Sequence, residues 1–93
     1  MPRYVIEREI ANVGAMAEDD RRGAAGRSNA VLRELGPEIQ WVHSYVTDEK
    51  MYCIYNAPSE ELIRKHAEHS GFPAHKVSRV RAVIDPLTAE SNA

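Results

Sequence analysis

The segment between positions 40 and 74 constrains the fold most, because a strand, a tight turn, a second strand and a capped helix follow one another there without a gap. Positions 39–47 and 51–57 are rich in β-branched and aromatic residues, a composition typical of strands. Asp48 and Glu49 lie between the two runs. This connection is short enough for a hairpin, so we expect the two strands to pair antiparallel.

A helix is predicted directly after the hairpin. Pro58 is favourable at a helix start and Ser59 can act as the N-cap, while Gly71 and then Pro73 end the helix. On a helical wheel His66 lies among Leu62, Ile63, Ala67 and Ser70, so this histidine should point toward the sheet.

The flanking regions predict a first strand over 3–10, a helix that follows Asp19 and Asp20 and stops at Gly36, and a last strand over 77–84. The first helix should turn one line of small and apolar residues inward: Ala24, Ser28, Val31 and Leu35. Arg21 falls on this apolar line if the helix is regular.

The predicted order is β-α-β-β-α-β, the ferredoxin-like arrangement of the α+β class, with a four-stranded antiparallel sheet and two helices on one face. We expect a single domain over 1–85 and a flexible tail over 86–93. The hairpin strands carry large apolar residues on both sides, and two helices can cover only one. The second face therefore predicts a homodimer through the sheet, as in dimeric α+β barrels.

Size and composition argue against several classes of protein. A chain of 93 residues has a thin core, which also favours oligomers, and a net charge of −2 argues against nucleic acid as a partner. One cysteine cannot form an internal disulfide, and no apolar run approaches the roughly 20 residues that span a bilayer. The N-terminus lacks the apolar core of a signal peptide. A cytoplasmic protein without a membrane partner is therefore expected.

Two interpretations of His66 stay open: a neutral core histidine with one hydrogen-bonded nitrogen, or a metal ligand that needs further groups. His43 and Cys53 lie on the two hairpin strands and offer imidazole and thiol, but a shift of one residue in register would place them on opposite faces. A lone cysteine in a strand is more often a small buried hydrophobe. His75 follows the helix stop and should be solvated.

Glutamates on the first strand and arginines on the last form a second polar group, Glu7, Glu9, Arg79 and Arg81, because these strands are neighbours in the predicted topology. A cross-strand ion pair is the simpler interpretation, and a clamp for an anionic substrate is the other. The strong short motifs of metal, phosphate or nucleophile chemistry are absent from the sequence.

Several phrases of the sequence form a distinctive set: Tyr4-Val5-Ile6-Glu7-Arg8, Ser28-Asn29-Ala30-Val31-Leu32, Trp41-Val42-His43-Ser44-Tyr45-Val46, Tyr52-Cys53-Ile54-Tyr55, Ala57-Pro58, His66 and Gly71-Phe72-Pro73-Ala74. With these phrases the chain resembles a family of small ferredoxin-like proteins, a domain of unknown function with one nickel-binding, nickel-responsive branch. The resemblance runs from Arg3 to about Pro86.

The resemblance implies a dimer and a site for a divalent transition metal, nickel first and zinc or copper next. His43 and His66 match the family pattern best, Cys53 and Glu7 occupy surrounding motif positions, and His69 is an addition of this sequence. A non-enzymatic metal-binding or metal-responsive protein is therefore the first hypothesis. The alternative is a cofactor-independent enzyme with a histidine or Glu7 as base in a pocket. A small structural dimer whose histidines only pack is the third.

Overall fold

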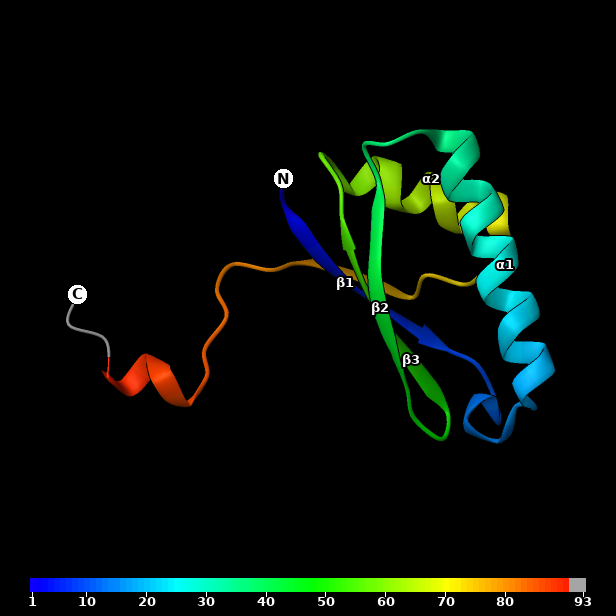
Figure 1. Ribbon diagram of the computed structural model, residues 1–93, viewed down its shortest axis with the longest axis horizontal. Coiled ribbons are helices and arrows are strands. Elements are labelled where there is room, and N and C mark those ends of the chain that lie inside the picture. The colour runs from blue at the N-terminus through cyan, green and yellow to red at the C-terminus, as the bar shows by residue number, and fades with distance from the viewer. Residues whose placement is uncertain (91–93) are drawn as a thin grey trace.

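The computed structural model describes residues 1–90 and contains the predicted succession of elements (Figure 1). Two short 3-10 helices, η1 and η2, accompany the strands and helices. The bounds are β1 Arg3–Glu9, η1 Val13–Ala15, α1 Glu18–Leu35, β2 Gln40–Val46, β3 Lys50–Asn56, α2 Glu60–Ser70, β4 Lys76–Arg79 and η2 Pro86–Glu90.

The strands form one antiparallel sheet in the order β2-β3-β1-β4, and α1 and α2 lie together on one side of it (Figure 1). This order confirms the ferredoxin-like prediction. We call the side under the helices the covered face and the other side the open face. The core lies on the covered face, where buried residues of β1 and β3 meet the second helix: Tyr4, Ile6, Cys53, Tyr55 and Ile63.

Both ends of α2 follow the predicted signals. Ser59 accepts a hydrogen bond at its Oγ from the backbone N–H of Leu62, at 3.4 Å. Gly71 takes the left-handed conformation, φ 77°, at the C-terminal end, and its N–H donates to the carbonyl of Ala67. These caps bond backbone groups that the helix itself leaves free. His66 thus points inward from the last turns of a helix with well-defined ends.

The last strand is shorter than predicted. β4 covers only Lys76–Arg79, not 77–84, because its partner β1 begins at Arg3 and offers little backbone beyond. The N–H of Val80 still donates to the carbonyl of Arg3, and the chain then leaves the sheet (Figure 1). Positions 86–90 of the predicted tail form η2, while 91–93 lie outside the described residues.

The predicted pairing of first-strand glutamates with last-strand arginines is wrong. The register places Glu7 opposite Lys76 and Tyr4 opposite Arg79, so Glu7 and Arg79 point to opposite faces. Lys50 of β3 instead lies 4.0 Å from carboxylate oxygens of both Glu7 and Glu9. Within residues 1–90, no helix is both long and apolar enough to cross a membrane.

Candidate functional site

The sheet separates the four candidate metal ligands into two pairs. Cys53 is the cross-strand partner of Ile6, which is fully buried beneath the helices, so Cys53 lies on the covered face. His43 pairs with Ile54 after an irregularity in β2, and the next residue along β2 pairs with Cys53. His43 therefore lies on the open face, as does Glu7, and His66 reaches the covered face from α2. His43 and Cys53 do not share a face.

His66 has the surroundings of a packed, hydrogen-bonded histidine. Its side chain is 1% exposed, and its Nε2 lies 3.2 Å from the Oγ of Ser28 on α1. The ring of Tyr55 is 5.2 Å away between centroids. Burial lowers the pKa of His66, and the hydrogen bond to the Ser28 backbone only partly opposes this effect. The neutral imidazole is favoured and connects the two helices, as the packing interpretation expects.

Cys53 accepts a hydrogen bond from an arginine that the sequence analysis did not single out. Arg8 of β1 is 2% exposed, and its Nε donates to the Sγ of Cys53 at 3.3 Å. Its Nη1 donates to the carbonyl of Pro73 at 2.7 Å. Nη2 is buried and has no hydrogen-bond partner among residues 1–90. The strand period contained the signal for this burial, because Arg8 continues the inward-facing line of Tyr4 and Ile6.

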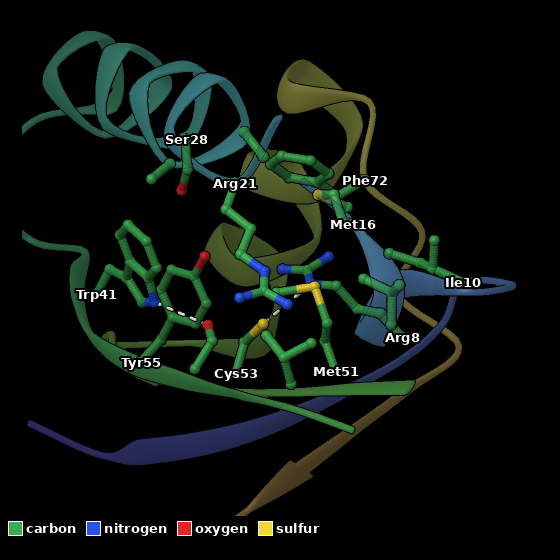
Figure 2. A pocket seen from close by; sticks show the side chains of 15 residues that line it. Arg8, Ile10, Met16, Arg21, Ser28, Trp41, Met51, Cys53, Tyr55 and Phe72 are labelled. Atoms are coloured by element: carbon green, nitrogen blue, oxygen red, sulfur yellow. Dashed lines mark hydrogen bonds between the residues drawn. The ribbon is translucent and has the colours of Figure 1, made fainter. Parts of the chain in front are cut away.

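A cavity of about 210 Å³ lies beside this arginine, between α1 and the covered face (Figure 2). Its walls are mostly apolar and include Trp41, Met51 and Phe72. Tyr55 also lines it, and burial raises the pKa of this phenol, while Ser28 and Arg8 partly oppose the rise. Tyr55 therefore keeps its proton at neutral pH and remains a hydrogen-bond donor.

The remaining histidines lie apart from the cavity. His69 and His75 are exposed, and the Nδ1 of His75 accepts a hydrogen bond from the backbone N–H of Glu9 at 2.9 Å. His43 stacks edge-on against Tyr45, with ring centroids 4.8 Å apart. Within the described part of one chain, no three or more His, Cys, Asp or Glu side chains gather where they could hold one metal ion.

These observations define a small ferredoxin-like α+β domain with an arginine-lined cavity on one side of its sheet and two candidate metal ligands, the exposed His43 and the half-buried Glu7, on the other. The model of the nickel responsive SCO4226-like proteins matches residues 4–80, and the chain belongs to this family. Its structure is similar to the crystal structure of SCO4226 from Streptomyces coelicolor A3(2), with a TM-score of 0.74 and 15% identity. That match covers 88% of this chain and 99% of the other. A search of curated proteins found no match.

Proposed function

We propose that this protein binds nickel(II) at the open face of its sheet, between two copies of the chain, as part of a nickel-responsive role. The observation that carries the proposal is the match to the nickel-responsive family over residues 4–80. The placement of His43 and Glu7 on the open face supports this location. Imidazole nitrogen suits nickel(II), and carboxylate oxygen can add to a mixed ligand set.

A second copy would remedy the shortage of ligands in one chain. In a two-fold dimer each ligand occurs twice, so two copies contribute His43 and Glu7 from both sides of one interface. Metal ions in proteins normally need at least three such groups, and residues 1–90 of one chain do not assemble them. The proposed site is therefore complete only in the dimer.

The open face also has the composition of a surface that another chain covers. Val5, Tyr52 and Ile54 are half-buried there, beside Tyr45, which is 59% exposed. α1 and α2 both lie on the other face (Figure 1). Packing two open faces together would bury this apolar area and enlarge a thin core.

The covered face offers less support for a metal site at His66 and Cys53, and for the enzyme hypothesis. His66 and Cys53 are engaged with Ser28 and Arg8, so each would have to give up a buried contact to bind metal. The enzyme hypothesis assigned the base to a histidine or Glu7. Among residues 1–90, those that line the 210 Å³ cavity include neither a histidine nor a glutamate.

Isothermal titration calorimetry with nickel(II) tests the proposal, on metal-free full-length protein at pH 7.5 and with the molecular mass measured in parallel. We expect one set of sites per dimer and an affinity that decreases below about pH 6, as imidazole protonates. His43→Ala should lose at least tenfold in affinity. Glu7→Gln should weaken binding less, because an amide oxygen can still coordinate.

His69→Ala is the matched control, because His69 is exposed on α2 and remote from the open face. It should bind nickel as the unmodified protein does. Unchanged affinity in His43→Ala would contradict the proposed site. Loss of binding in His66→Ala but not in His43→Ala would move the site to the covered face, and the absence of nickel binding would overturn the proposal.

A further inference from the structure

We propose that the cavity between α1 and the sheet binds a small organic carboxylate, whose charged end lies between Arg8 and Arg21 and whose apolar body fills the space beyond. This binding activity is separate from the proposed nickel site, because the cavity lies on the covered face and His43 on the open face.

The Arg8 guanidinium is the first reason. A guanidinium keeps its positive charge in proteins, and a buried charge is costly unless charged or polar groups surround it. Arg8 is 2% exposed, and it donates to the Sγ of Cys53 and to the backbone carbonyl of Pro73. Its guanidinium carbon lies 5.7 Å from the centroid of the Phe72 ring, and within residues 1–90 no carboxylate forms an ion pair with it. Nη2 has no acceptor at all within residues 1–90. The group is positioned for an anionic oxygen that residues 1–90 do not supply.

Arg21 brings a second positive charge to the same place. Figure 2 shows its side chain extending from α1 toward Arg8 and Cys53. Its Nη2 donates to the carbonyl of Gly14 at 3.0 Å, which holds the guanidinium at the cavity. Of the described residues that line the cavity, none is acidic. The neighbouring Arg22 differs, since it forms ion pairs with Glu18 and Asp19. Two arginines without a local carboxylate favour an anionic ligand.

The rest of the cavity selects an organic ligand over an inorganic one. Its walls are mostly apolar and are formed by side chains such as Trp41, Met51 and Phe72 (Figure 2). An apolar cavity of about 150 Å³ in another protein holds benzene, so the 210 Å³ found here has room for a ligand the size of phenylacetate. Tyr55 and Ser28 add hydroxyl groups at one wall. A compact monocarboxylate matches both the charge and the apolar lining.

Trp41 is the only tryptophan and lines the cavity, so its fluorescence reports on occupancy. Metal-free protein is titrated with butyrate, hexanoate and phenylacetate, each compared with its neutral amide, and with inorganic phosphate. At least one carboxylate should bind saturably with one site per chain. It should bind at least tenfold more tightly than its amide, because the amide lacks the charge that strengthens hydrogen bonds to guanidinium.

Arg21→Met should lower the affinity for the carboxylate at least tenfold and leave the affinity for the amide unchanged. Arg22→Met is the matched control: it removes the same charge one position away, outside the cavity lining, and should bind as the unmodified protein does. Arg8→Met serves as a second variant where circular dichroism shows that it folds, and it should lose the preference for carboxylate over amide.

Three results would overturn the proposal: no saturable change with any carboxylate, equal affinity for acid and amide, or equal losses in Arg21→Met and Arg22→Met. If phosphate bound as tightly as the best carboxylate does, the assignment of an organic ligand would also be overturned. Nickel binding by the same protein decides none of these outcomes, because all the titrations are made without metal.

Discussion

Arg8 donates a hydrogen bond to the carbonyl oxygen of Pro73 at 2.7 Å, and this contact ties the end of β1 to the segment between α2 and β4. The same guanidinium donates from Nε to Cys53 on β3. One buried side chain therefore connects three parts of the fold that are distant in sequence.

Arg8→Lys should destabilise the protein although it keeps the charge. A lysine ammonium cannot reproduce the planar arrangement of donors that reaches Cys53 and Pro73 together. We expect a loss of about 1.5–3 kcal/mol in the free energy of unfolding, the range for hydrogen bonds to charged groups. Urea unfolding followed by circular dichroism measures it. Arg22→Lys, an exposed control on α1, should change stability by under about 0.5 kcal/mol, and equal stabilities of the two variants would refute the structural role of Arg8.

Gly14→Ala should also destabilise the protein. A Cβ at this position would lie 2.7 Å from the carbonyl oxygen of Thr47 and 2.8 Å from the Cα of Asp48, so η1 and the hairpin turn would have to move apart. The N–H of Gly14 donates to the backbone carbonyl of Asp48 at 3.0 Å, and that hydrogen bond would be strained as well. We expect a loss of about 1–3 kcal/mol, the usual cost of overpacking.

Gly23→Ala is the matched control for Gly14→Ala. Gly23 lies inside α1, and an added Cβ there meets nothing within 4 Å. Alanine should therefore stabilise the helix by about 0.5–1 kcal/mol. Thermal melts of the two variants should move in opposite directions. A Gly14→Ala protein as stable as the unmodified chain would show that the hairpin turn is free to shift.

The elements of this fold were predictable from sequence because their signals are local. Ser59 and Gly71 mark the ends of α2 within a few residues, and Asp48 and Glu49 mark the hairpin turn. The order of elements then limits the sheet to few topologies, and the ferredoxin-like prediction was confirmed.

Register and buried charge were not predictable in the same way. The irregularity between Trp41 and His43 decides which face His43 occupies, and composition does not reveal it. The length of β4 depends on where β1 begins, which is a property of another segment. Arg8 continues the strand period of Tyr4 and Ile6, but arginine is rarely fully buried, so the period alone did not single it out; in the folded sheet Arg8 is 2% exposed.

Stability should fall as the solution is acidified below about pH 6.5, the unperturbed pKa of histidine. Burial lowers the pKa of His66 in the folded protein, so the unfolded chain binds the proton more readily. The contribution is fully present above pH 6.5 and is lost as pH falls toward the folded pKa, by at most about 1.4 kcal/mol per pH unit. Urea unfolding at intervals between pH 5 and 7.5 measures the slope.

His66→Asn removes the titrating group and should flatten this dependence, even though its stability at pH 7.5 is lower. His43→Asn, exposed on the open face, is the control and should retain the slope. A His66→Asn protein that still loses stability as steeply between pH 6.5 and 5 would assign the effect to other groups.

Tyr45→Arg should convert a dimer into a monomer if two open faces pack together. Tyr45 is 59% exposed and stacks against His43, so an arginine there would set like charges from two copies against each other at the proposed interface. We expect the mass measured by light scattering to halve at a protein concentration where the unmodified chain is dimeric.

Leu87→Arg is the control, because Leu87 is 70% exposed in η2, away from the sheet, and this substitution should leave the mass unchanged. Tyr45→Arg should bind nickel more weakly because it loses the dimer, and the proposed site needs ligands from both copies. A monomer that binds nickel as tightly as the unmodified protein would show that the metal site does not lie at the interface.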